Sequence, residues 1–210
     1  MFDQKSSIGD FLVATAAKQP TPGGGSVAAL AGALAAAMGE MCLSYSVGKK
    51  ATLPETEGIL RQALVEMNRA RQLMLELMCE DQLAYEALTA ARKMPENSPD
   101  RQSQVNVALL ACIRVPQAMA ACALAVVELV DRVWELTSVY LLSDLAVCAE
   151  LAMATVRSGV YNVRANSSAL PDAKERMHFE EATEKVLAHA IATVKRCLPR
   201  IWERHRMESK

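Results

Sequence analysis

The fold is decided by residues 26–47, SVAALAGALAAAMGEMCLSYSV. Small side chains fill most of this stretch, and Ala is the strongest helix former. Glu40 is its only charged residue. A helix with so little side-chain bulk has to pack with its backbone close to its neighbours. The stretch therefore predicts a helix in the middle of a helical bundle.

The ends of this helix are marked by residues that stop or start helices. Before it, residues 20–25 read PTPGGG, which breaks any earlier helix. Ser26 is predicted to cap the helix, and Gly48 to follow its C-terminus, because Gly enters the left-handed conformation without strain. Upstream, a shorter helix is predicted to start at the cap residue Ser7 and to stop before Pro20.

Strand signals are almost absent downstream, and helical periodicity continues to the end of the chain. Breaks are expected near Gly58 and at Pro116, the latter as a kink. We expect an all-α fold, a single-domain bundle of about six helices over residues 1–210. The four helices after the first two are predicted over 54–93, over 100–135, over 143–165, and from Pro171 to Pro199 or a little beyond.

The composition excludes several classes of protein. With 51% hydrophobic residues the chain is not disordered. Lys and Arg number 23 against 24 Asp and Glu, so no overall field attracts nucleic acid or an anionic membrane. The longest apolar stretch, residues 115–127, is shorter than the roughly 20 residues of a membrane span. We therefore expect neither a nucleic-acid partner nor a membrane-spanning segment.

The cysteines and histidines indicate no special chemistry. All 6 cysteines lie in apolar helical stretches without a Cys-x-x-Cys pair, and are interpreted as core residues. The 3 histidines lack metal-ligand spacing, so no metal site is expected. The opening residues MFDQK do not resemble a signal peptide, which favours a cytoplasmic location.

A candidate for acid–base chemistry lies in the helix predicted over 54–93. The 3-4 spacing of its apolar residues places Arg71 and Asp81 on the stripe that faces the core. A carboxylate there needs a charged or hydrogen-bonding partner, or its pKa rises until it is neutral. Either outcome suits acid–base catalysis. The structural alternative is an ion pair of Asp81 with Arg71 or another basic group.

The helix predicted over 143–165 carries a second candidate, a polar stripe without Lys or Glu. Such a stripe indicates either a network of hydrogen bonds between helices or the wall of a polar ligand pocket. Ser143 is predicted to cap the helix, and Asp144 lies in its first turn, where the helix dipole stabilises an anion. The stripe runs through Asp144, Cys148, Leu151, Thr155, Ser158, Asn162 and Asn166.

Several short motifs, in order along the chain, resemble the cyclodeaminase/cyclohydrolase family. That family includes the C-terminal half of formiminotransferase-cyclodeaminase and stand-alone methenyltetrahydrofolate cyclohydrolases. The likeness covers nearly the whole chain, and the order of the motifs makes it specific. The motifs are PTPGGGS at 20–26, GKK at 48–50, Asp81 in Asp-x-x-Ala-Tyr, KMP at 93–95, VP at 115–116, SD at 143–144 and NVRAN at 162–166.

The resemblance implies an all-helical homodimer that acts on a tetrahydrofolate derivative at the carbon shared by N5 and N10. The activity is that of a formiminotetrahydrofolate cyclodeaminase or of a methenyltetrahydrofolate cyclohydrolase, and the residues leave this choice open. Neither route needs a metal or a permanently bound cofactor. The likeness starts at the first helix, so no formiminotransferase domain is expected.

The resemblance also implies residue roles. Asp81 is expected to be the acid–base group, with Asp144 as a second carboxylate that steadies the cation or relays the proton. The glycines and Ser26 would offer main-chain donors, the two asparagines would bond the pterin edge, and Lys49 would meet the glutamate tail. The expected binding residues are Gly24, Gly25, Ser26, Lys49, Ser143, Asn162 and Asn166.

A protein of another class also fits much of the sequence. A non-catalytic helical bundle could use the Met- and Ala-rich faces for dimerisation or ligand storage. Such a module has no reason to bury an acid beside a polar pocket. The surroundings of Asp81 therefore decide between the two classes.

Overall fold

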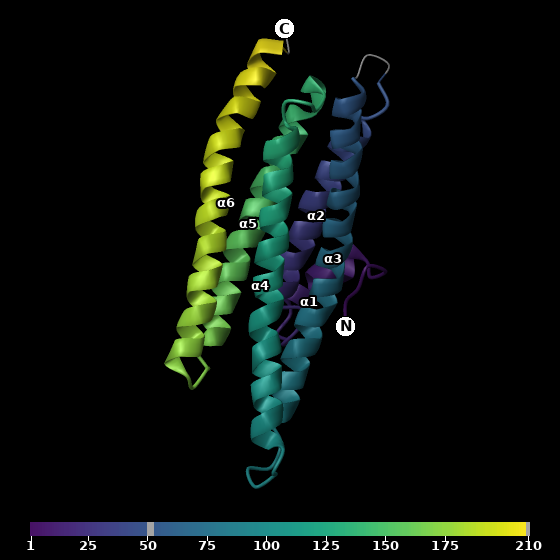
Figure 1. Cartoon of the computed structure of the whole chain (residues 1–210). Coiled ribbons are helices and arrows are strands. Elements are labelled where there is room, and N and C mark those ends of the chain that lie inside the picture. Colours follow the sequence, from purple (N-terminus) through teal and green to yellow (C-terminus); the bar gives the residue numbers. More distant parts are fainter. Residues whose placement is uncertain (50–52, 209–210) are drawn as a thin grey trace.

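The computed structural model describes residues 1–49 and 53–208 (Figure 1). Within these ranges the chain forms six α-helices and one short 3-10 helix, η1, and no strand. The predicted all-α fold is confirmed. The elements are α1 (Ile8–Ala16), α2 (Gly24–Ser44), α3 (Pro54–Arg92), α4 (Arg101–Val133), η1 (Val139–Leu141), α5 (Leu142–Ser167) and α6 (Ala173–Glu208).

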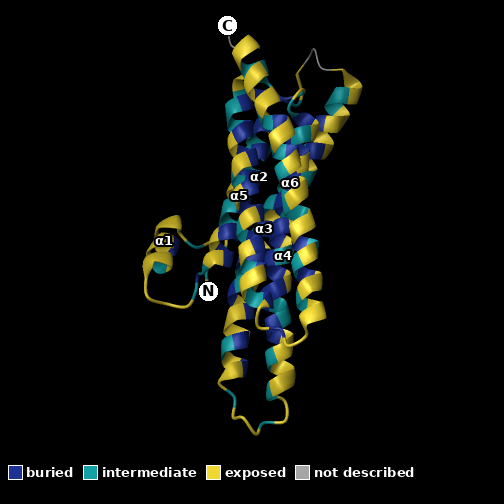
Figure 2. Cartoon of the chain, turned by 90° about the vertical axis from the view of Figure 1, so that its left-hand side faces the viewer, coloured by how far each residue is buried: buried dark blue, intermediate teal, exposed yellow. Residues whose placement is uncertain are grey.

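Four long helices form the centre of the molecule. Helix α2 packs against α3 and α5, and α4 packs against the same two helices from the other side, so α2 and α4 lie diagonally opposite each other. Helix α6 runs along α5 and α4. The short α1 stands at the side of the bundle (Figure 2), and its buried residue Phe11 joins the core between α2 and α3.

The predicted close packing of α2 is confirmed. Ala29, Ala35 and Ala36 are fully buried. A Cβ atom on Gly39 would lie 2.6 Å from the Met67 methyl carbon. Long side chains of α3 therefore rest directly on the backbone of α2, which only small residues permit.

The predicted start of α1 is confirmed, whereas α2 ends earlier than predicted. The Ser7 hydroxyl caps α1 by accepting the backbone N–H of Asp10 at 3.0 Å. Gly48 takes the predicted left-handed conformation, with a φ of 75°, but α2 already ends at Ser44 and does not continue to Val47. Lys50, the last residue of the GKK motif, lies outside the described residues.

Two predicted caps are wrong. Helix α2 begins at Gly24 with Gly23 in the cap position, so Ser26 lies inside the first turn. Helix α5 begins at Leu142 directly after η1, which places Ser143 inside its first turn as well. In both cases the chain enters the helix earlier than expected, so the hydroxyl is left to other partners.

The expected interruptions of the long helices do not end them. Helix α3 runs through the exposed Gly58 without a break. Pro116 lies inside α4, and Pro199 lies inside α6, which continues to Glu208. Tertiary packing holds these helices together where local sequence alone favours a break.

Three of the described helical stretches are long and apolar enough, by length and composition, to cross a membrane: Gly24–Ser44, Arg101–Val133 and Val139–Ser167. Charged residues interrupt these stretches, so only shorter uncharged runs such as residues 115–127 stand out in the sequence. Between 50% and 56% of each apolar window is buried inside the protein. Packing within the bundle gives one reason for this composition, and the absence of a membrane span stays a prediction.

Candidate active site

A cavity lies where α2 begins. Helix α3 has 39 residues and α2 only 21, so α3 continues past the N-terminal end of α2 together with α4 (Figure 1). The space beyond this end holds a cavity of about 350 Å³. Its walls are Pro20, Thr21, Gly23, Gly24 and Gly25; Asp81, Tyr85, Leu88 and Arg92 of α3; Leu109 and Cys112 of α4; and Asn162, Ala165, Asn166 and Ala169.

Asp81 connects α3 to the first turn of α2. The Ser26 hydroxyl donates a hydrogen bond to Oδ2 of Asp81 at 2.7 Å. A Cβ atom on Gly25 would lie 1.9 Å from Oδ1, so only glycine fits beneath this carboxylate. The first turn of a helix carries unpaired N–H groups and the positive end of the dipole. The Gly-Gly-Gly-Ser motif thus places an anion-stabilising helix end directly on Asp81.

The pKa of Asp81 is raised above its ordinary value of 3.8, and burial is the main cause. Hydrogen bonds from the side chain and the backbone of Ser26 act in the other direction and lower it. The carboxyl group is therefore pulled toward the neutral form by its surroundings and toward the charged form by one residue. Such a balance suits a group that takes up and returns a proton.

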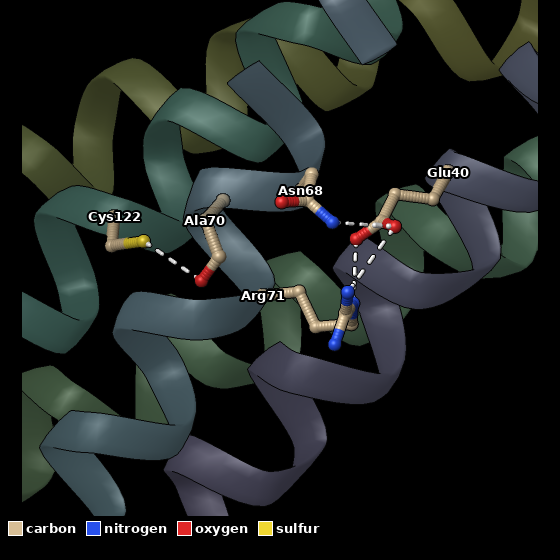
Figure 3. Close-up of polar contacts among 5 residues, drawn as sticks. All are labelled: Glu40, Asn68, Ala70, Arg71 and Cys122. Atoms are coloured by element: carbon tan, nitrogen blue, oxygen red, sulfur yellow. Dashed lines mark hydrogen bonds and ion pairs between the residues drawn. The ribbon is translucent and has the colours of Figure 1, made fainter. Parts of the chain in front are cut away.

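Arg71 does not neutralise Asp81, which corrects the structural alternative. Its Nε atom lies 2.6 Å from Oε1 of Glu40, and Asn68 Nδ2 donates to the other oxygen at 3.1 Å (Figure 3). Arg71 and Asp81 are ten residues apart, about 15 Å along a helix. Arg71 therefore meets the later part of α2, and Asp81 meets its start. No ion pair of Asp81 occurs within residues 1–49 and 53–208.

Asn162 faces the same end of α2. Its Nδ2 atom donates to the carbonyl of Ser158 in its own helix at 2.8 Å. A Cβ atom on Gly24 would lie 3.5 Å from its Oδ1, so this oxygen points toward the first turn of α2. The side chain therefore lines the cavity with a hydrogen-bond acceptor.

Asn166 has a structural task that the sequence analysis missed. Pro116 has no N–H, so the carbonyl of Cys112 loses its usual partner four residues later in α4. Asn166 Nδ2 donates to this carbonyl at 2.7 Å. The amide therefore ties α5 to α4 and also lines the cavity. The signal in the sequence was the proline itself.

Two further wall residues were not predicted. Tyr85 and Arg92 follow Asp81 at positions i+4 and i+11, on the same face of α3. Arg92 is the only Lys or Arg among the described wall residues. The helical spacing from Asp81 was the signal that would have found both.

The other end of the bundle holds three of the predicted residues, Ser143, Asp144 and Lys49. The start of α5 packs beside the end of α2, where Cys42 Sγ lies 3.7 Å from the Leu141 carbonyl. Burial and the charge of Asp144 raise the pKa of Cys42 to about 12, so Asp144 and Ser143 belong to this region. Asp144 is 18 residues before Asn162, about 27 Å along the helix. One chain does not bring Asp144 or Ser143 to the cavity of Asp81.

Lys49 is also remote from this cavity. It lines a separate hollow with Ser46, Thr137 and Arg204, at the C-terminal end of α2. Within the described part of the chain, no group of three or more His, Cys, Asp and Glu is placed to hold a metal ion. The predicted residues that meet at one cavity are thus Gly24, Gly25, Ser26, Asp81, Asn162 and Asn166.

Comparisons with known proteins find relatives that match most of this chain. The methenyltetrahydrofolate cyclohydrolase of Methylorubrum extorquens is 32% identical over 193 residues, which cover 89% of this chain and 91% of that protein. The formimidoyltransferase-cyclodeaminase of Gallus gallus is 29% identical over 87% of this chain, which spans about a third of that longer protein (34%).

The fold is also found in a solved structure. A crystal structure of formiminotetrahydrofolate cyclodeaminase from Thermotoga maritima superimposes with a TM-score of 0.81 over 98% of both chains, at 24% identity. The family model described as formiminotransferase-cyclodeaminase matches residues 7–185. The chain therefore belongs to the formiminotransferase-cyclodeaminase family.

Proposed function

We propose that this protein acts on tetrahydrofolate derivatives at the carbon that bridges N5 and N10, as a methenyltetrahydrofolate cyclohydrolase. The observation that carries the proposal is the carboxyl group of Asp81, half-buried on the wall of an otherwise uncharged polar end of the cavity. The relative with that activity in its name matches this chain over nearly its whole length. A non-catalytic bundle gives no account of this placement of Asp81.

Hydrolysis needs one group that accepts a proton and later returns it. Water attacks the cationic methenyl carbon, and the Asp81 carboxylate takes a proton from the water as the C–O bond forms. The protonated Asp81 then delivers this proton to N5 as the C–N5 bond breaks. The hydroxyl proton leaves to solvent as the formyl C=O forms on N10. The reaction thus consumes one water and releases one proton.

The surroundings of Asp81 fit both halves of this cycle. Its negative charge stabilises the cationic substrate before the attack. Burial favours the protonated form in the intermediate, while the Ser26 hydrogen bonds favour the carboxylate that starts the next cycle. Asn162 and the first turn of α2 supply an acceptor and donors for the polar edge of the pterin.

Cyclodeamination is the second candidate function, because the family match and the similar fold both carry that name. In this reaction N10 attacks the formimino carbon, and Asp81 protonates the departing nitrogen so that ammonia leaves. Assaying 5-formiminotetrahydrofolate and 5,10-methenyltetrahydrofolate on one preparation distinguishes the two. Turnover of neither substrate would support the non-catalytic alternative.

The proposal includes the setting in which the enzyme works. Residues 1–210 would act as one domain in the cytoplasm, without a nucleic-acid or membrane partner. Both reactions are acid–base reactions at carbon and nitrogen, so they require no permanently bound cofactor and no metal.

We also propose a homodimer formed through α2. The outward face of α2 carries a stripe without charge, in which Val27, Leu34 and Tyr45 are 41%, 50% and 67% exposed. Helix α6 covers α4 and α5 and leaves this stripe open. A twofold axis across its middle would pair the stripe with that of a second copy in antiparallel orientation. The full stripe is Val27, Ala31, Leu34, Met38, Met41 and Tyr45.

Antiparallel pairing bears on the predicted second carboxylate. Asp81 lies beside the start of α2 and Asp144 near its end, and the 21 residues of α2 rise about 30 Å between them. In an antiparallel dimer each end faces the opposite end of the other copy. Asp144 of the partner subunit would then approach the cavity of Asp81, and only this arrangement keeps the predicted pair of carboxylates in one site.

Asp81→Asn should lower turnover by about 100-fold or more, the usual scale for loss of an acid–base group. In the parent protein the rate of hydrolysis should fall as the pH falls through the raised pKa of Asp81, because the protonated carboxyl cannot accept a proton from water. The variant should lack this decline. Rates across pH and melting temperatures check both points, with the exposed neighbour Glu80→Gln as control. A variant that loses stability but keeps its rate would reduce Asp81 to a structural role.

The two asparagines should separate in experiment. Asn162→Ala should weaken the binding of a folate analogue by about 1 to 3 kcal/mol. It should change the free energy of unfolding by less than about 0.5 kcal/mol. Asn166→Ala should lower the free energy of unfolding by about 1 to 3 kcal/mol, because it leaves the Cys112 carbonyl without a partner. Titration and urea unfolding measure the two quantities, and Ser158→Ala serves as control. Equal effects of both variants on both quantities would contradict these roles.

Leu34→Glu should convert the dimer into monomers, because it places two carboxylates in the middle of the uncharged stripe. Sedimentation at micromolar concentration measures the change. Met177→Glu, at an equally exposed apolar position of α6, should leave the dimer intact. A parent protein that is already monomeric would remove this interface, and with it the role of Asp144.

A further inference from the structure

The wall that α3 gives to the cavity changes character in a fixed order. Asp81, Tyr85, Leu88 and Arg92 lie on one face of the helix at steps of four, three and four residues. From Asp81 to Arg92 the helix rises about 16 Å. This wall therefore runs from a carboxylate through an aromatic and an aliphatic side chain to a cation.

The facing walls follow the same order. Asn162 lies beside Gly24, at the level of Asp81. One turn further, Asn166 is bonded to the Cys112 carbonyl at 2.7 Å. Leu109, 4% exposed, comes next on α4, and Leu88 across from it is 5% exposed. The cavity is thus polar beside α2 and apolar in its middle, with Arg92 at its far end.

The guanidinium of Arg92 is available for a ligand. Among the ion pairs of the described chain, none includes Arg92. Its backbone carbonyl accepts a hydrogen bond from Arg101, which fixes the end of α3 without using the side chain. The charge of Asp81 raises the pKa of Cys112 and the charge of Arg92 lowers it, and all three residues line the cavity.

The order of groups in a folate matches the order of these walls. A reduced folate carries its reactive nitrogens at a polar pterin, then a p-aminobenzoyl ring, and then a glutamate with two carboxylates. We infer that Arg92 binds a carboxylate of the substrate's glutamate, with the p-aminobenzoyl ring between Tyr85, Leu88 and Leu109. This inference rests on the proposed folate activity and assigns to Arg92 the task predicted for Lys49, which lies at the other end of the bundle.

The assignment makes Arg92 a specificity residue. Arginine binds carboxylates through two parallel hydrogen bonds, and this geometry fixes the position of the tail as well as its charge. A tail held about 16 Å from Asp81 along α3 holds the bridging carbon at the carboxyl group. Pterins without a glutamate would lose this anchor.

The test compares KM and kcat of Arg92→Gln, Arg92→Lys and the parent protein for 5,10-methenyltetrahydrofolate. Arg92→Gln should raise KM about 10- to 100-fold, the range of a charge-assisted hydrogen bond, and change kcat only a few-fold. Arg92→Lys should recover part of the loss. The exposed neighbour Lys93→Gln is the control and should match the parent. An unchanged KM for Arg92→Gln would overturn the inference.

A second arm removes the glutamate instead of the arginine. 5,10-Methenyltetrahydropteroate, which lacks the tail, should show a raised KM with the parent protein and no further rise with Arg92→Gln. Equal discrimination against this substrate by both proteins would overturn the inference while leaving the folate activity intact.

Binding of 5-formyltetrahydrofolate, followed by titration calorimetry, separates the inference from the proposal on which it rests. Weaker binding to Arg92→Gln than to the parent supports the inference even when neither protein turns over a substrate. No binding of this folate to the parent protein would overturn the inference and the proposed function together. If Arg92→Gln matches the parent protein in both turnover and binding, the inference is overturned and the proposed function is not affected.

Discussion

The contact between the Asp81 carboxylate and the first turn of α2 is the interaction on which the rest of the site depends. It requires a glycine at position 25, because a Cβ atom there would overlap the carboxylate oxygen. It uses the Ser26 hydroxyl as a donor at 2.7 Å. It also fixes where α2 starts, and the shorter length of α2 leaves the cavity open between α3, α4 and α5. The glycine-rich motif therefore both places the Asp81 carboxylate and leaves room for the cavity beyond the start of α2.

The charges of α3 are divided along its length. Arg71 is bound to Glu40 of α2, and Asn68 holds the same carboxylate (Figure 3). Arg71 therefore forms its ion pair about three turns away from Asp81. The hydrogen-bond partner of the Asp81 carboxyl group is the neutral Ser26. A carboxyl group next to a guanidinium would stay ionised across the physiological range, whereas neutral donors allow its pKa to rise. Arg71 thus holds α3 to α2, while Asp81 on the same helix stays free of an ion pair among the described residues and is available for acid–base chemistry.

The sequence predicted the helices and the face of each critical residue, because helical periodicity reports the angle around the axis. It placed Asp81, Asn162 and Asn166 on inward faces, where the structure finds them at one cavity. Periodicity does not report which levels of two helices meet. The polar stripe of α5 runs from Asp144 to Asn166, about 33 Å, and only its last part reaches the cavity.

Other features of the site need the folded neighbours. The caps expected at Ser26 and Ser143 failed because Gly23 and η1 start the helices earlier. The bond from Asn166 to the carbonyl freed by Pro116 joins residues 54 positions apart in the chain, from Cys112 to Asn166. No local pattern predicts such a contact.

In the proposed mechanism Asp81 exchanges a proton during catalysis and is not a permanently ionised cap of α2. A titration of its side-chain carboxyl carbon by NMR, assigned with Asp81→Asn, measures this directly. We expect a pKa above 3.8 in the free protein, because burial outweighs the hydrogen bonds from Ser26. A pKa at or below 3.8 would show that the helix end keeps the carboxylate charged, and would rule out Asp81 as the group that exchanges the proton.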